Sequence, residues 1–423
     1  MKTIKTIQFV LHPLILPRCC AAMRLARRAT FRTFLALTLA GAATLLARTA
    51  SAQAWQTVDD FQYVAGQIAV NFGLAVAPSG ALFASGFAYD ASGVGHGLVM
   101  ASADAGNTWS APLDDFVYPG SITRYDGGIV SDSAGNLYVA GRYYGGTAST
   151  DKIVRRSADG GATWTTVDDF QSNNYYEFPL AAGAITADAG GNVYVTEPFS
   201  AWVVRKGVGG TNFTTVDSLS TGGGITGVEG VFAHPTAGVF SVGSAYVVVK
   251  NRSTVAWLVR RSTNGGATWT SVDTYQASSG YGARALSAGA DAKGNIYVVG
   301  EASVPYKSSS LSHWIIRKSA DGGTSWTTVD NYQLSTTSDQ RAVGFATDSS
   351  GNLYAAGYTW GAGSQWIVRE NPGGTGAWTT MDSFPYVSGA NAHAIAADSL
   401  GNVFVGGQGS PASGAVHWLV RKN

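Results

Sequence analysis

Residues Ser157–Gln171 read SADGGATWTTVDDFQ, and the fold of this chain follows from the recurrence of that stretch. Close copies are STNGGATWTSVDTYQ from Ser262 and SADGGTSWTTVDNYQ from Ser319, and a looser copy is SADAGNTWSAPLDDF from Ser102. Two shorter copies keep only the last part, which ends at Asp217 in one and at Asp382 in the other. Internal repeats of roughly 50 residues are typical of solenoids, propellers and arrays.

Each repeat divides into four short strands. Runs rich in Val, Ile, Tyr and Trp alternate with Gly, Asp and Asn turns, and no helical periodicity is sustained after the N-terminal region. In the fifth repeat the predicted strands are Ala285–Ala290, Ile296–Val299, Trp314–Arg317 and Thr327–Asp330. The chain is therefore predicted to be all-β, with seven such repeats.

The two ends of the repeat region predict a closed ring. The last repeat stops at Asn423 after its third strand, whereas Ala54–Phe61 resembles a fourth strand with no repeat before it. The N-terminal strand can complete the last sheet, as in a seven-bladed β-propeller with four-stranded blades. An open solenoid would need capping repeats instead. Residues 53–423 are expected to form this one domain.

The first 52 residues are predicted to be a secretory signal peptide. They carry eight basic and no acidic residues, an apolar run from Phe34 to Leu46, and small residues before a cleavage point after Ala52. Met23 would give a leader of more usual length and is a candidate for the true start. We therefore expect a secreted or periplasmic protein with no membrane insertion after cleavage, because no later apolar run is long enough to span a bilayer.

Charge and cysteine content narrow the possible functions. Of the 28 basic residues eight lie in the leader, which leaves 20 against 27 acids, a net charge of −7. An acidic chain without a basic stripe is not expected to bind nucleic acid. Both cysteines, Cys19 and Cys20, precede the cleavage point, so the exported chain has no disulfide and no thiolate ligand. We expect no metal, no cofactor and a monomer.

The repeated motif S-x-D-G-G-x-T-W resembles the Asp-box, or BNR repeat, of the sialidase-like β-propeller superfamily. The Asp carboxylate is expected to accept hydrogen bonds from the turn, and the Trp to pack under it. These residues are expected to be structural, and the motif matches no specific enzyme family. They are Ser102, Asp104 and Trp109; Ser157, Asp159 and Trp164; Ser262, Asn264 and Trp269; and Ser319, Asp321 and Trp326.

Positions shared by all blades are expected to build blades. One position holds Asp in all seven repeats, from Asp59 to Asp382, and is expected to make local hydrogen bonds. Another holds Arg in six repeats, with Met100 as the exception. Trp begins five of the third strands and is expected to pack between blades.

Function is expected where the blades differ, on loops at the face opposite the Asp-boxes. In related propellers the ligand is bound there, by the loops that precede the first strand and follow the second. The candidate ligand-binding residues are Arg124, Tyr125, Asp126, Arg142, Glu177, Glu229, Arg284, Glu301, Arg341 and His393.

Two functions stay open from the sequence. The favoured hypothesis is an exported non-catalytic propeller that binds a carbohydrate, a surface polymer or an extracellular protein. The alternative is a glycoside hydrolase. A sialidase-like site would use Arg124, Arg284 and Arg341 around a substrate carboxylate, and Tyr125 or Tyr281 with Glu229. A carboxylate pair would be Asp126 with Glu177 or Glu229. The F-R-I-P signature of sialidases is absent.

Overall fold

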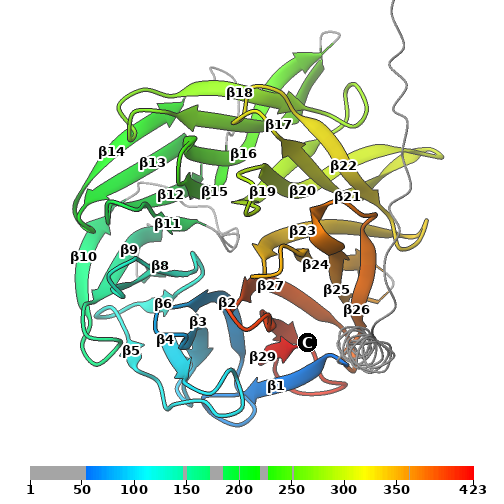
Figure 1. Ribbon diagram of the computed structural model, residues 1–423. Helices are drawn as coiled ribbons and strands as arrows, with labels where there is room; N and C mark the ends of the chain where they lie inside the picture. Colours follow the sequence, from blue (N-terminus) through cyan, green and yellow to red (C-terminus); the bar gives the residue numbers. More distant parts are fainter. Residues whose placement is uncertain are drawn as a thin grey trace, which may run out of the picture. The chain divides into compact units, whose positions relative to one another are not determined.

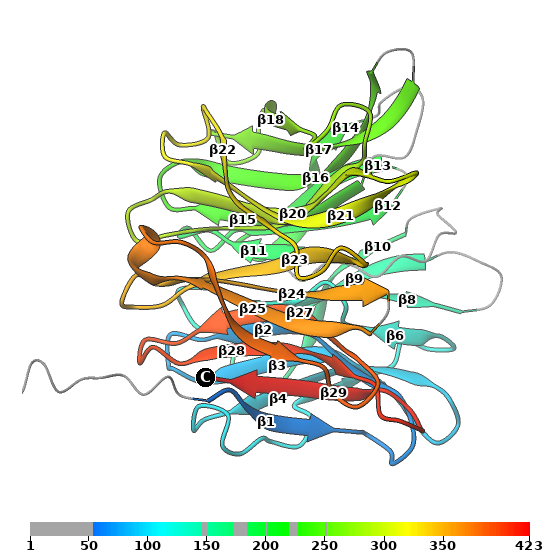
Figure 2. The ribbon, with the colours of Figure 1, turned by 90° about the vertical axis from the view of Figure 1, so that its right-hand side faces the viewer.

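A computed structural model describes residues 54–145, 150–171, 184–199, 201–219, 227–249, 252–361 and 363–423. The chain from Trp55 to Asn423 is one compact unit. Its strands form seven antiparallel sheets that follow one another around a common axis (Figures 1 and 2). This arrangement is a seven-bladed β-propeller, which confirms the predicted fold. The predicted leader lies outside the described residues.

Blades are numbered in chain order, and strands are given from the axis outward. Blade 1 contains β2 (Ala69–Val76), β3 (Leu82–Tyr89), β4 (Gly95–Ser102) and β5 (Asp114–Phe116). Blade 2 contains β6 (Ile122–Arg124) and β7 (Ile129–Ser131), which share the innermost position, then β8 (Leu137–Tyr144), β9 (Thr150–Ser157) and β10 (Thr165–Phe170). Blade 3 contains β11 (Ile185–Ala187), β12 (Val193–Phe199), β13 (Ala201–Val208) and β14 (Thr211–Leu219).

The remaining blades repeat this order. Blade 4 contains β15 (Gly227–His234), β16 (Gly238–Val249), β17 (Arg252–Ser262) and β18 (Thr270–Tyr275). Blade 5 contains β19 (Ala283–Ala290), β20 (Ile296–Tyr306), β21 (Ser309–Ser319) and β22 (Thr327–Tyr332). Blade 6 contains β23 (Ser338–Thr347), β24 (Leu353–Gly361), β25 (Gln365–Asn371), the 3-10 turn η1 (Pro372–Gly374) and β26 (Thr379–Phe384). Blade 7 contains β27 (Ala390–Ala397), β28 (Val403–Gly409) and β29 (His417–Lys422).

The N-terminal strand closes the ring. β1 (Gln56–Phe61) pairs antiparallel with β29 and becomes the outer strand of blade 7, as predicted. Phe61 packs edge-on against the fully buried Trp418, with ring centroids 6.1 Å apart. The last blade therefore joins the two ends of the propeller domain, and β29 does not present an open edge.

Tryptophans pack between blades, as the repeat pattern predicted. Trp257, in the middle of β17, lies against Gly300 of the next blade, where a Cβ would come within 2.8 Å of the indole. Trp314 lies in the same way against Gly357. Both indoles are fully buried. The glycines are needed for this close approach, since any side chain there would displace the tryptophan.

The repeated aspartates also join blades, which corrects the expectation that their hydrogen bonds are local. Each of six arginines donates two hydrogen bonds of 2.7–3.0 Å, from Nε and Nη2, to the aspartate of the preceding blade. The pairs are Arg155–Asp114, Arg205–Asp168, Arg260–Asp217, Arg317–Asp273, Arg369–Asp330 and Arg421–Asp382. Asp59, the seventh aspartate, has no such partner, because Met100 occupies the arginine position.

The repeated S-x-D-G-G-x-T-W residues form hydrogen-bonded turns between third and fourth strands. Asp159 Oδ1 accepts hydrogen bonds from the Ser157 hydroxyl at 2.7 Å and from the Thr163 amide at 2.9 Å. The Trp164 indole donates to the Gly161 carbonyl at 3.1 Å. Hydrogen bonds from the Thr163 hydroxyl, the Thr163 amide and the Ser157 hydroxyl lower the pKa of Asp159 to about 2. The side chains of this motif thus stabilise their own hairpin turn.

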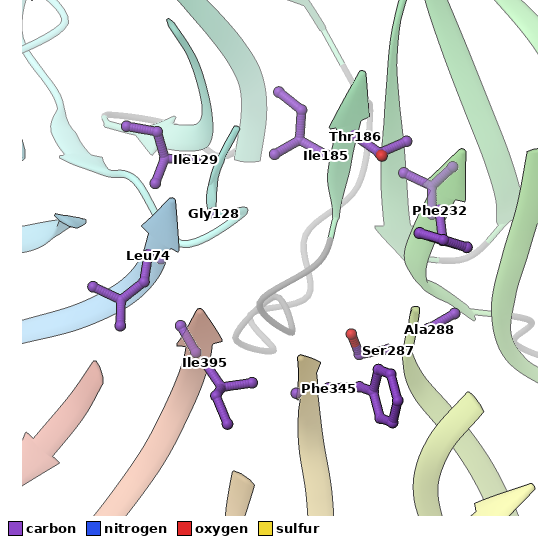
Figure 3. Close-up of a pocket in the computed structure, with 14 residues that line it drawn as sticks. Leu74, Gly128, Ile129, Ile185, Thr186, Phe232, Ser287, Ala288, Phe345 and Ile395 are labelled. Carbon is purple, nitrogen blue, oxygen red and sulfur yellow. The ribbon is translucent and has the colours of Figure 1, made fainter. Parts of the chain in front are cut away.

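The axis of the ring holds a cavity of about 160 Å³. Small residues of the first strands line it, among them Gly73, Gly128 and Gly344. A Cβ on Gly73 would come within 2.8 Å of the Gly128 backbone, so the blades are in close contact here. Figure 3 shows apolar side chains such as Leu74 and Ile395 around the same space.

Candidate functional site

The ends of the blades opposite the repeated turns form the mouth of the propeller. In blade 5, Ile296 at the start of β20 pairs with Ser319 beside the turn, whereas Glu301 pairs with Arg284 on one side and Trp314 on the other. First strands begin and second strands end at this face. The variable residues predicted from the sequence therefore belong to one end of the molecule.

Four of these residues come together at the mouth, and we call them the mouth cluster: Glu229, Arg284, Glu301 and Arg341. Each lies on a different strand of blades 4 to 6, and Glu229 occupies a bulge in β15. Arg341 Nη2 donates to Glu301 Oε1 at 3.1 Å. The Arg341 guanidinium also lies 4.3 Å from the ring centre of Trp360, which fixes its orientation.

Burial governs the titration of the two acids. It raises the pKa of Glu229 and that of Glu301, although Arg284 and Arg341 pull both in the opposite direction. The charge of Glu301 raises the pKa of Glu229 further. Glu229 is half-buried. Raised pKa values in a concave site are a feature of functional carboxylates.

His393 extends the cluster into blade 7. Its ring stacks on Phe72 with centroids 4.6 Å apart and meets Tyr358 at 6.1 Å. Burial lowers its pKa to about 4, with a smaller contribution from the charge of Arg341 and against a hydrogen bond with Gln408 that acts in the opposite direction. The imidazole is therefore neutral at pH 7 and can act as a hydrogen-bonding group but not as a cation.

Several polar atoms at the mouth have no hydrogen-bond partner within the described residues. They are Glu301 Oε2, Arg341 Nε and His393 Nε2, all of them buried atoms. Beside Glu301 lies a cavity of about 190 Å³, which Arg284 and Ser303 also line. Buried polar atoms without partners are costly, so this concentration marks a place suited to receive polar groups of a ligand.

The candidates in blade 2 do not join the mouth cluster. The Arg124 guanidinium lies 4.4 Å from the Phe87 ring centre and donates to the Tyr89 hydroxyl at 2.5 Å. Its described contacts are with blades 1 and 2, so it does not complete a three-arginine site with Arg284 and Arg341. The sialidase-like arrangement considered from the sequence is therefore not formed.

Tyr125 is a packing residue, which corrects its selection as a ligand-binding candidate. Its ring has no exposed surface and fills the space beside Gly97, where other blades have tryptophan. Its hydroxyl donates to Asp114 at 2.6 Å. Asp126 and Arg142 form a buried ion pair at 2.6 Å, with side-chain exposures of 1% and 3%. Ligand access to any of these three residues would require the blade to open.

The remaining expectations at the mouth concern Glu177 and metals. Glu177 lies outside the described residues. Within the described ranges there is no group of three or more His, Cys, Asp or Glu side chains arranged to hold a metal ion. Nor does any helix in this part of the chain have the length and apolarity to cross a membrane.

Two mouth residues were not selected from the sequence. Trp360 and Tyr358 both flank the Arg341 guanidinium, at 4.3 and 5.7 Å from their ring centres. The signal available was the aromatic pair in Tyr358-Thr-Trp360, which lies in β24 and has a matching pair, Phe87-Ala-Tyr89, in β3 of blade 1.

Comparisons with known proteins identify the fold. No family model and no curated protein matches the chain. A polysaccharide lyase described as ulvan lyase has 11% identity over 82% of this chain and 93% of its own, with a TM-score of 0.51. An α-L-arabinanase from Penicillium chrysogenum has 15% identity over 86% and 98%, with a TM-score of 0.48. A protein of unknown function from Dyadobacter fermentans has 11% identity over 88% and 99%, with a TM-score of 0.49. At such identities the likeness concerns the fold alone.

Proposed function

We propose that this chain is an exported, non-catalytic β-propeller that binds a carbohydrate at the mouth cluster. The observation that carries the proposal is the Arg341–Glu301 pair, in which Glu301 Oε2 and Arg341 Nε have no hydrogen-bond partner among the described residues, while Glu301 also lines a cavity. Sugar hydroxyls both donate and accept hydrogen bonds, so they can satisfy a carboxylate oxygen and a guanidinium N–H at once. Tyr358 and Trp360 add aromatic surface for the apolar faces of a sugar.

A second candidate function is glycoside hydrolysis at the same place. The observation that favours it is that burial raises the pKa of both Glu229 and Glu301. Two carboxyl groups with different environments can serve as an acid and a base in cleavage of a glycosidic bond. Non-catalytic binding is preferred because Tyr125 is buried in the core and Arg124 lies with another group of residues.

The test is a screen of the purified protein on a panel of neutral and acidic glycans, with binding and product release measured on the same samples. We expect binding without turnover, weakened about tenfold or more by Glu301→Gln, since hydrogen bonds to charged groups contribute about 1.5–3 kcal/mol. The matched control is Lys293→Gln, an exposed residue of the same blade in the Asp291–Asn295 turn at the opposite face. No binding by the folded protein would contradict the proposal. Turnover lost in Glu229→Gln or Glu301→Gln would replace it by the second candidate.

Export is part of the proposal and has its own test. The leader predicted from residues 1–52 should be removed after Ala52. N-terminal sequencing of the protein recovered from the medium or the periplasm should then begin at Gln53. Recovery of the uncleaved chain from the cytoplasm alone would contradict this part.

A further inference from the structure

The hairpin of β16 and β17 in blade 4 extends beyond the other strands of its blade at the mouth. β15 pairs with β16 only as far as Ser244, and β18 pairs with β17 only as far as Trp257. The pairing of β16 with β17 continues for five further residue pairs, to Val249 and Arg252. Figure 1 shows the end of this hairpin projecting from the outline of the ring. Within the described residues, the end of the hairpin therefore has no neighbouring strand on either side.

The end of β16, Ala245–Val249, has the features of an unprotected edge strand, and we call it the blade 4 edge. Its sequence is Ala-Tyr-Val-Val-Val, with no charged residue and no proline, and tyrosine and valine favour strands. Val248 is 73% exposed, and Tyr246 and Val247 are half-buried. Among the described residues the backbone of this segment pairs only with β17. A row of unpaired N–H and C=O groups is a template for a strand from another chain.

The equivalent hairpin of blade 5, formed by β20 and β21, is protected against such pairing. The two hairpins can be aligned on their repeated tryptophans, Trp257 and Trp314, and Pro305 then takes the position of Val248. A proline offers no N–H to an incoming strand, and the exposed Lys307 follows two residues later. β20 stays paired with β21 on both sides of Pro305, so a proline at this position does not disturb the hairpin. Blade 4 thus has the same projecting hairpin without its protection.

The other edge of the blade 4 hairpin is less suited to pairing. It is formed by β17, in which the polar run Arg252-Ser253-Thr254 lies across from the valines. Gln276 Nε2 donates a hydrogen bond to Thr254 Oγ1 at 3.5 Å, so a residue that follows β18 contacts this strand. An uncharged apolar strand gains more from the cover of a second strand than a polar one does. The blade 4 edge is therefore the side of the hairpin at which another strand would pair.

We propose that the blade 4 edge pairs antiparallel with the same edge of a second copy of this chain, which gives a homodimer in place of the monomer expected from the sequence. The segment is complementary to itself, because a two-fold axis at Val247 places Tyr246 of each copy opposite Val248 of the other. Pairs of an aromatic and a β-branched residue stabilise antiparallel sheets. No like charges meet, since the segment has none. The inference does not depend on the proposed carbohydrate binding.

The test is sedimentation equilibrium of the purified protein over a range of about 1 to 100 µM, because the population of a dimer depends on concentration. A pair of five-residue strands buries less than the roughly 1,200–2,000 Å² of a stable interface, so we expect a dissociation constant in the micromolar range. Hydrogen exchange at the two ends of the concentration range locates the contact. The amides of Ala245–Val249 should be more protected at the high concentration.

Substitutions of Val248 separate edge pairing from other contacts. Val248→Pro copies Pro305 and should raise the dissociation constant at least about tenfold, because it removes an N–H from the edge. Val248→Lys should have the same effect, since pairing would then bury a charge. Val248→Thr is the matched control, because it keeps both the N–H and a β-branched side chain, and it should change the constant by less than about threefold. The reciprocal variant is Pro305→Val, which unprotects the blade 5 hairpin and should give species larger than a dimer.

The outcomes decide the inference in either direction. A protein that stays monomeric throughout the concentration range would overturn it, and a strand of another protein would then be the occupant left for this edge. A dimer of unchanged affinity in both Val248→Pro and Val248→Lys would place the interface elsewhere and would also overturn it. If Val248→Pro lowers the melting temperature, Val248→Lys decides, because a side chain 73% exposed can be replaced without loss of packing. Failure of the glycan screen would leave this result unaffected.

Discussion

The boundaries between blades are of two kinds. At six of them an arginine makes two hydrogen bonds to an aspartate of the preceding blade, as in Arg317–Asp273. At the seventh, between blade 7 and blade 1, Asp59 has the same place but Met100 replaces the arginine. Asp59 Oδ2 is buried and has no hydrogen-bond partner in the described part of the chain, and burial raises the pKa of this carboxyl to about 7, with Asp60 contributing. The boundary that closes the ring is therefore the one without an ion pair.

The difference shows what the arginine contributes. At five of the paired boundaries the guanidinium also covers an aromatic ring of the preceding blade, at 3.8–4.4 Å from its centre. The aromatic equivalent at the closing boundary is Phe61, which packs against Trp418 within its own blade. An aspartate that is partly buried keeps its charge only when a cation compensates the loss of water. Closure thus depends on the pairing of β1 with β29 inside blade 7, where His417 also contacts Asp60 and Arg421 donates to Thr57.

Removal of β1 should lower the stability of the propeller more than any of the substitutions below. Without residues Ala54–Phe61 the edge of β29 loses its partner strand, and Trp418 loses the cover of Phe61. We expect the melting temperature to fall by more than about 10 °C relative to a chain that begins at Gln53. Circular dichroism on both chains gives the measurement. An unchanged melting temperature would contradict closure by this strand.

The paired boundaries can be converted to the unpaired kind. Arg317→Met copies Met100 at the boundary between blades 4 and 5, and it leaves Asp273 buried without a cation. We expect a loss of about 3–5 kcal/mol in the free energy of unfolding at pH 7, because breaking a buried pair leaves an uncompensated charge. Urea denaturation of this variant and of Lys293→Gln measures the difference. A loss below about 1 kcal/mol would mean that the six ion pairs contribute little.

The raised pKa of Asp59 predicts that the stability of the boundary between blades 7 and 1 depends on pH. Its pKa of about 7 in the folded chain lies above the ordinary value of 3.8 for an aspartate, so the folded state binds the proton more tightly than the unfolded state. Below about pH 4 the carboxyl is protonated in both states and does not reduce the free energy of unfolding. As the pH rises from 4 through 7, the free energy of unfolding falls, because the unfolded state loses this proton first. Asp59→Asn should be more stable than the native protein by up to about 4 kcal/mol at pH 8, because each unit of the rise from 3.8 to about 7 corresponds to about 1.4 kcal/mol, and equal to it at pH 4. Melting curves across this range give the answer, and a difference independent of pH would contradict it.

The missing arginine can also be supplied. Met100→Arg should add about 1 kcal/mol of stability at pH 8, less than a natural pair because Met100 is itself buried in an apolar cluster. The gain should disappear in the Asp59→Asn background, since the new cation then has no carboxylate. Urea denaturation of the two single variants and the double variant forms the required cycle. An equal gain in both backgrounds would show that the arginine acts elsewhere.

The sequence allowed the scaffold to be predicted more fully than the site. Seven blades, the closing strand and the packing of Trp257 and its equivalents follow from repetition, because every blade has the same packing needs. The count of seven aspartates against six arginines was visible, but their pairing across blades was not, since partners lie about 40 residues apart. The mouth is less predictable still. Arg124 and Arg284 look alike in sequence, and only the structure separates them, because non-repeated side chains take positions that depend on neighbouring blades.

The smallest effect is expected where a pair is built for binding and not for stability. Glu301→Gln removes the charge of the half-satisfied pair with Arg341 but keeps the size of the side chain and one acceptor oxygen. Burial already raises the pKa of Glu301, so the loss of its charge should change the free energy of unfolding by less than about 1 kcal/mol at pH 7. Asp273→Asn, the matched change in a fully bonded pair, should cost at least twice as much, because its carboxylate accepts both arginine hydrogen bonds. Equal losses in the two variants, measured by urea denaturation, would place Glu301 among the structural pairs and remove the reason for regarding its free oxygen as a ligand contact.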